Sequence, residues 1–174
     1  MRLSKKLSIA AILAALSVII MLIGSLIETV TLATAAVASV GVIIAIIELG
    51  KSYGIMVYVA TTALSLLLLP IKDPALFYAL SFGYYPIIKL LIEKITYRPI
   101  SYLLKGIVFT AAFSVLFYIA VKFLVPGTNL MKYLIFIYPA ALVVFFVFDY
   151  ALSKLIRSYV FNLRKRLGID KLLK

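Results

Sequence analysis

Cysteine and histidine are absent from this sequence of 174 residues, and Asp and Glu together number only six. Without cysteine the chain can form no disulfide and carry out no thiolate chemistry. Without histidine it lacks the commonest metal ligand and the usual general base. We therefore predict that the chain is not an enzyme, holds no metal ion and needs no cofactor.

Apolar residues dominate the composition of the chain. The sequence is 66% hydrophobic and has a mean hydropathy of +1.20, whereas a soluble domain is about half apolar. This composition predicts an all-α, polytopic membrane protein with a single domain over residues 1–174. Six spans of about 20 residues would occupy most of the chain. No room would remain for a nucleotide-binding domain, so the energy source would be an ion gradient, a partner subunit or nothing at all.

Apolar segments alternate with breaks made of proline, glycine and charged residues, a pattern that predicts six transmembrane helices. We expect spans at 7–27, 31–49, a third ending at 69, then 75–95, 103–124 and one from 131 past 157. The first segment resembles a secretory signal. Its apolar run is longer than a signal core and no small-x-small cleavage site follows, so a retained span is predicted.

Basic residues predict the orientation of these spans. With both termini in the cytoplasm, 15 of the 18 Lys and Arg fall on the inner side, and only Lys72, Lys122 and Lys132 fall outside. This asymmetry follows the positive-inside rule and predicts a multi-pass protein of the cell inner (plasma) membrane. Residues 158–174 form a basic amphipathic tail, which we expect to lie along the anionic lipids of the cytoplasmic leaflet. The tail is not expected to bind nucleic acid.

The predicted fourth span contains the most unusual stretch, from Phe82 to Lys94. Pro86 removes one backbone hydrogen bond and predicts a kink. Lys89 and Glu93 are four residues apart and share a helix face, where they can form an ion pair. Asp149 in the sixth span is expensive in lipid unless it is paired, and Arg98, Lys89 or Lys94 could pair with it. A role for Asp149 in ion coupling is the alternative.

Two adjacent phenols, Tyr84 and Tyr85, fall near the middle of the predicted fourth span. A buried phenol needs a hydrogen-bond partner, which a bound ligand or a carbonyl freed by Pro86 could supply. We predict a ligand site in the outer half of the protein that includes Tyr84, Tyr85, Tyr138 and Asn129, with Glu28 as a lid or ligand residue. Tyrosines near span ends, such as Tyr118 and Tyr133, are expected instead to form an interfacial aromatic belt.

Small residues recur at helical spacing in the first span, at Ala10, Ala11, Ala14 and Ala15. Such a stripe lets another helix approach closely in lipid. It predicts either packing inside the protein or docking of a separate membrane partner.

The basic start Arg2-Leu3-Ser4-Lys5-Lys6-Leu7, followed by the alanine-rich first helix, resembles the substrate-binding S component of energy-coupling-factor (ECF) vitamin transporters. This resemblance implies six spans with both termini inside and a small nutrient bound near the outer face. It also implies that an Ala-x-x-x-Ala stripe, here Ala11 and Ala15 or Ala10 and Ala14, docks on a transmembrane coupling subunit powered by ATPases.

Two other classes of protein stay open. One is a non-catalytic membrane scaffold similar to the six-span rod-shape-determining proteins. The other is an independent small transporter or channel, which the near absence of charge from the second and third spans disfavours.

Overall fold

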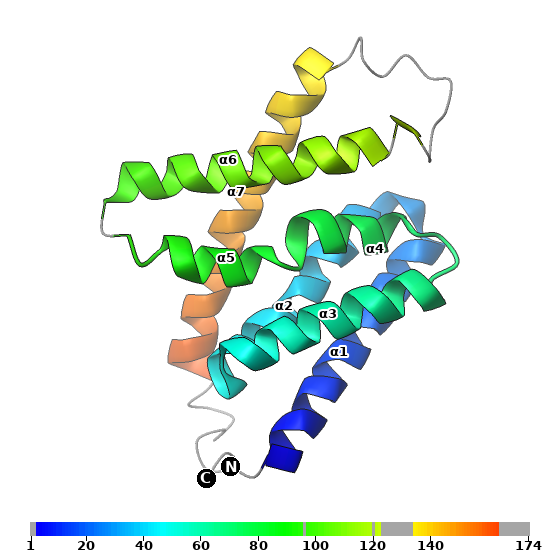
Figure 1. Cartoon of the computed structure of the whole chain (residues 1–174), viewed down its shortest axis with the longest axis vertical. Helices are drawn as coiled ribbons and strands as arrows, with labels where there is room; N and C mark the ends of the chain where they lie inside the picture. Colours follow the sequence, from blue (N-terminus) through cyan, green and yellow to red (C-terminus); the bar gives the residue numbers. More distant parts are fainter. Residues whose placement is uncertain (1–2, 96, 120, 123–133, 164–174) are drawn as a thin grey trace.

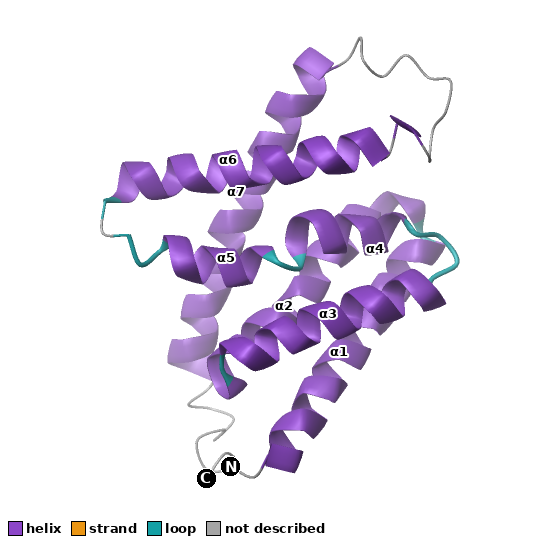
Figure 2. Ribbon diagram, viewed as in Figure 1, coloured by secondary structure: helices purple, strands orange, loops and turns teal. Residues whose placement is uncertain are grey.

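The computed structural model describes residues 3–95, 97–119, 121–122 and 134–163, without the side chains of Glu28, Arg98, Leu134, Asn162 and Leu163. Within these ranges every regular element is a helix (Figure 2), and six helical segments are long and apolar enough to cross a membrane. The predictions of an all-α protein and of six spans are therefore confirmed.

Three of the spans are single helices: α1 (Leu3–Leu26), α2 (Thr31–Leu49) and α3 (Lys51–Leu68). A short helix, η1 (Glu28–Val30), joins α1 to α2. The fourth span is built from three consecutive pieces, α4 (Asp73–Phe77), η2 (Tyr78–Phe82) and α5 (Tyr85–Ile92). The last two are α6 (Arg98–Ile119) and α7 (Leu134–Ser158), which continues into η5 (Tyr159–Leu163).

Besides α1, which begins at Leu3 rather than residue 7, two spans begin earlier than predicted, and each of these two carries a proline in its first turn. The fourth begins at Asp73 rather than residue 75, and α6 begins at Arg98 rather than residue 103. Pro74 and Pro99 are the second residues of these helices. The N–H groups of a first turn have no partner within the helix, so the missing N–H of proline costs nothing there. The sequence interpretation was wrong to place these prolines before the helices.

The start of α1 and the end of α7 lie at the same end of the molecule (Figure 1). There, the Lys6 ammonium lies 5.8 Å from the ring centre of Tyr53 in the first turn of α3. The Tyr159 hydroxyl donates to Glu48 Oε1 near the end of α2 at 3.2 Å. Residues 164–174 of the predicted tail lie outside the described residues.

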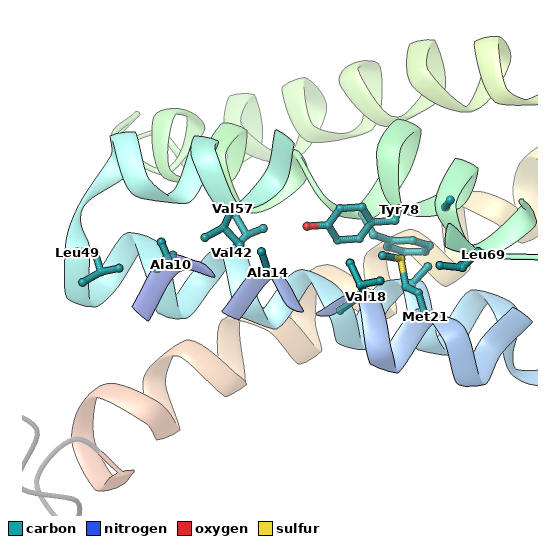
Figure 3. Packing of buried hydrophobic residues seen from close by; sticks show 14 residues of the cluster. Ala10, Ala14, Val18, Met21, Val42, Leu49, Val57, Leu69 and Tyr78 are labelled. Atoms are coloured by element: carbon teal, nitrogen blue, oxygen red, sulfur yellow. The ribbon is translucent and has the colours of Figure 1, made fainter. Parts of the chain in front are cut away.

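The helices α1, α2 and α3 pack tightly through small side chains. A Cβ added at Gly24 would lie 1.8 Å from Thr34 Oγ1 on α2, and one at Gly41 would lie 2.4 Å from Ser17 Oγ on α1. The Ser17 hydroxyl donates across this contact to the Ala38 carbonyl at 3.0 Å. Figure 3 shows Ala14 of α1 close to Val42 of α2 and Val57 of α3. The close approach of α1 and α2 therefore depends on glycine and serine.

The fourth span is broken at its middle, as the proline predicted. In η2 the Gly83 N–H donates to the Tyr78 carbonyl at 2.7 Å, five residues back, rather than to Ala79. The Ala79 carbonyl accepts instead from the Tyr58 hydroxyl of α3, at 2.9 Å. A freed carbonyl is costly in a membrane unless another group satisfies it, and α3 supplies that group.

The helices α6 and α7 cross through aromatic rings. Phe109 of α6 stacks on Phe145 of α7 with ring centres 4.2 Å apart, and the edge of Tyr85 packs on Phe145 at 4.9 Å. Ile43 of α2 and Leu152 of α7 complete this second core. Because α2 contributes to both cores, it joins the α1–α3 bundle to the C-terminal helices.

Candidate functional site

A hollow of about 300 Å³ lies at the end of the molecule opposite the start of α1, between the α1–α2 connection and the α3–α4 turn. Its lining combines threonine, acidic and apolar side chains: Gly24, Thr29, Thr31, Leu32, Ile71, Asp73 and Phe77. The Thr31 hydroxyl donates to the Gly24 carbonyl at 3.2 Å and thereby ties α2 to the end of α1. We call this space the outer hollow.

A second space of about 80 Å³ lies between α2, α4, η2, α6 and α7. Five of its lining residues are phenylalanines, and the full lining is Leu32, Phe77, Ser81, Phe82, Phe109, Phe113, Ala141, Val144 and Phe145. We call it the aromatic hollow. Leu32 and Phe77 line both spaces, so the two hollows adjoin.

The rings around the aromatic hollow hold one another in place. Phe109 stacks on Phe145, and its ring centre also lies 5.7 Å from that of Phe113. On the opposite wall, Phe82 packs edge-on against Phe148 at 4.7 Å. Aromatic pairs at such separations contribute about 0.5–1.5 kcal/mol beyond the burial of their area. The walls are therefore set by neighbouring side chains before any ligand binds.

A buried cluster of charged groups joins α5, α6 and α7, and we call it the ion cluster. Lys89 Nζ contacts Asp149 Oδ1 and lies 2.7 Å from Ser153 Oγ and 3.2 Å from Glu93 Oε1. Lys105 Nζ lies 3.1 Å from Asp149 Oδ2 and 3.0 Å from Glu93 Oε1. Two ammonium groups thus share two carboxylates.

Burial explains why these charges must balance. Lys89 is 1% exposed, and Lys105 and Asp149 are also buried, whereas the Glu93 side chain is 45% exposed. An unpaired charge at such depth would be strongly destabilising. The Tyr85 hydroxyl adds a hydrogen bond to Asp149 Oδ1 at 2.5 Å. The cluster therefore fastens the C-terminal helices to one another.

Lys105 is the member of this cluster that sequence reasoning missed, because it was assigned to the cytoplasmic side on the charge count. Its position inside an apolar helix was the available signal, since an ionisable residue within a span usually has a charged partner. Lys94, one of the predicted partners of Asp149, is exposed. The side chain of Arg98, another predicted partner, lies outside the described residues.

The tyrosines proposed as ligand contacts lie elsewhere. Tyr85 is fully buried with its hydroxyl on Asp149, and neither Tyr85 nor Tyr84 is among the described residues that line the two hollows. Tyr138 lies 2.9 Å from Ser114 Oγ, where α6 meets α7. Glu28 is part of η1, and the next residue of this short helix, Thr29, lines the outer hollow. Asn129 and Tyr133 lie outside the described residues.

The alanine stripe of α1 divides between two faces of the helix. Ala10 and Ala14 are 5% and 3% exposed and pack in the α1–α3 core, which is the internal packing that the sequence allowed. Ala11 and Ala15 are exposed. Of the four alanines, only these two are free to meet another helix.

Comparison of the chain with protein-family models, with curated proteins and with solved structures found no match. The features of the molecule that bear on function are the hollows, the ion cluster and the exposed face of α1.

Proposed function

We propose that the chain is a membrane-embedded solute-binding subunit of a nutrient uptake transporter, of the kind found as S components of ECF vitamin transporters. The observation that carries this proposal is the pair of adjoining hollows, one larger and partly polar, the other smaller and aromatic. Small-molecule sites are typically concave and mostly apolar, with a few polar groups that fix orientation.

In this proposal the outer hollow faces the outside of the cell and both termini lie in the cytoplasm. The positive-inside distribution of Lys and Arg supports this orientation. So does the grouping of Lys6, Lys51 and Arg157 near the end of the molecule opposite the outer hollow. The membrane is the cell inner (plasma) membrane.

The solute-binding residues are those of the hollows rather than the tyrosines expected from the sequence. Leu32 and Phe77 form the passage between the hollows, and Phe109 and Phe145 form the inner wall. Tyr85 takes a supporting role, since its ring packs against Phe145 while its hydroxyl is fixed by Asp149.

Transport energy would come from a transmembrane coupling subunit and its ATPases. The exposed Ala11 and Ala15 offer a small-residue face on α1 to which a partner helix can pack closely in lipid. Ala10 and Ala14 serve the internal bundle instead.

A non-catalytic membrane scaffold is the second candidate. It is favoured by the walls of the aromatic hollow, which are almost entirely hydrocarbon and suit a lipid chain as well as a solute. A scaffold would bind no specific small molecule.

Native mass spectrometry of the purified protein separates the two candidates. A solute-binding subunit should retain a small non-lipid molecule, and Leu32→Trp should reduce its occupancy at least about tenfold by filling the passage. Leu67→Trp is the matched control, because Leu67 is 78% exposed on α3 and should leave occupancy unchanged. Lipid adducts alone, equal in all three proteins, would favour the scaffold.

A further inference from the structure

Ser81 is a buried hydroxyl at the aromatic hollow without a hydrogen-bond partner among the described residues. It is 4% exposed. Four other buried serines, Ser17, Ser25, Ser39 and Ser65, each bond to a carbonyl of their own helix; for Ser39 and Ala36 the distance is 2.6 Å. A buried hydroxyl left unpaired destabilises a protein by about 1–3 kcal/mol.

Ser81 lies in the π-helical turn, where the Gly83 N–H donates to the Tyr78 carbonyl at 2.7 Å. Ser81 is among the residues that line the aromatic hollow, together with Phe82, Phe109 and Phe145. A ligand with a polar group on an aromatic ring could satisfy this hydroxyl while its faces contact the phenylalanines.

The outer hollow carries a second unpaired polar group of defined charge. Asp73 is half-buried on its lining and forms no ion pair with any described residue. The neighbouring cation does not neutralise it, because Lys72 Nζ donates to the Leu69 carbonyl at 2.6 Å. Phe77, which lines both hollows, offers a ring to which a passing cation is attracted.

Resting on the proposed function, we propose that the two hollows bind one small aromatic cation. Its ring would occupy the aromatic hollow with a hydrogen-bonding substituent at Ser81, and its ammonium group would lie in the outer hollow at Asp73. Eight residues of helix separate these two anchors, a rise of about 12 Å. A single ring with a short amine-bearing arm matches that length.

Three commercial probes test the chemical class by ligand-observed NMR on the protein in lipid nanodiscs. Tyramine carries both the ring hydroxyl and the ammonium, phenethylamine lacks the hydroxyl, and 4-hydroxyphenylacetate replaces the cation by an anion. We expect tyramine to bind about fivefold more tightly than phenethylamine, as one hydrogen bond predicts. We expect 4-hydroxyphenylacetate to bind at least about tenfold more weakly than tyramine, because its carboxylate faces Asp73.

Two variants test which residue causes the preference for the ring hydroxyl and which causes the preference for the ammonium group. Ser81→Ala should remove the difference between tyramine and phenethylamine, and Asp73→Asn should remove the preference for the amine over the acid. Ser8→Ala is the control, since Ser8 lies exposed at the opposite end of α1. A melting temperature for Ser81→Ala at or above that of the parent would show that the loss is not one of folding.

The outcomes distinguish this inference from the proposed function. Equal binding of tyramine and 4-hydroxyphenylacetate by the parent would overturn the aromatic cation, as would preferences that persist in both variants. A co-purified solute that is anionic or purely aliphatic would also overturn it and leave the solute-binding function standing. A co-purified aromatic amine would support it even if the three probes failed to bind. Absence of both probe binding and co-purified solute would overturn both.

Discussion

The two halves of this protein hold their helices together by different means. The bundle of α1, α2 and α3 uses small residues, so that Gly24 and Gly41 bring backbones into contact across α1 and α2. The helices α5, α6 and α7 instead use large rings and buried charges, such as Phe109, Phe145 and the ion cluster. Within lipid, an apolar side chain is buried as well against a lipid chain as against another helix. Close packing and polar contacts must therefore hold the helices together.

The difference teaches where a solute can be accommodated. Where Gly24 and Gly41 join α1 to α2 there is no room even for an added Cβ, whereas aromatic rings line a space between α2, α6 and α7. The aromatic hollow lies along the seam between the two halves, with Leu32 of α2 facing Phe109 of α6 and Phe145 of α7. The site is thus a consequence of joining a tight bundle to a looser one.

Breaking the ion cluster should have the largest effect on stability. In Asp149→Leu, Lys89 and Lys105 would share the half-exposed Glu93 alone, and we expect a loss of about 3–5 kcal/mol. The measurement is thermal unfolding in detergent together with the yield of folded protein. Because the remaining Lys105–Glu93 pair is balanced, Lys89→Met with Asp149→Leu should recover most of the loss. If Asp149→Leu alone were as stable as the parent, this result would contradict the stabilising role of the ion cluster.

Filling the tight contact in the other half should come next. Gly24→Val would drive a branched side chain into Thr34, and overpacking of this kind destabilises by about 1–3 kcal/mol. Gly106→Ala provides the matched control, since a Cβ there meets nothing within 4 Å. We expect the melting temperature to fall for Gly24→Val and to hold or rise for Gly106→Ala. Equal effects at the two glycines would argue against close packing of α1 and α2.

Removing the hydroxyl that satisfies the broken fourth span should have a smaller effect. Tyr58→Phe leaves the Ala79 carbonyl without its 2.9 Å donor, and we expect a loss of about 0.5–1.5 kcal/mol in the same unfolding assay. Tyr150→Phe, at a position 70% exposed, should change stability by less than about 0.5 kcal/mol. If the two variants unfolded alike, Tyr58 would not stabilise the break.

The exposed alanines of α1 should affect stability least and transport most. Ala11→Leu lies outside the core and should change the free energy of unfolding by less than about 0.5 kcal/mol. It should nevertheless abolish solute uptake in cells while solute binding persists, because the partner helix could no longer approach. The buried Ala14→Leu should instead lower the melting temperature. Normal uptake by Ala11→Leu would remove the docking role.

Composition and local spacing carried the sequence predictions only part of the way. The six spans follow from apolar length, the break from Pro86, and the proximity of Lys89 and Glu93 from one helical turn. The partner of Asp149 on α6 could not be predicted, because its position depends on how three helices pack. Ala10 and Ala11 differ by about 100° around the helix, so the sequence could not say which of them faces the bundle.

The tyrosines show the same limit. The depth of a residue along a span can be counted from the first residue of the span. The direction in which its side chain points cannot be counted in this way when a π-turn intervenes, because the turn changes the angle between successive residues. The turn at η2 rotates Tyr85 toward Asp149 and leaves Ser81, which carried no signal in the sequence, on the aromatic hollow.

The sequence contains no cysteine, so a single introduced cysteine can be labelled without background. Such labelling is the most direct test of whether the solute site opens to the outside of the cell. The test uses two single-cysteine variants. Ile71→Cys lies on the lining of the outer hollow, and Ser4→Cys is exposed in the first turn of α1. Intact cells carrying either variant would be treated with a membrane-impermeant maleimide. We expect Ile71→Cys to be labelled at once and Ser4→Cys only after the cells are permeabilised. Labelling of Ser4→Cys in intact cells, with Ile71→Cys protected, would place the hollow on the cytoplasmic side and contradict capture of a nutrient from outside.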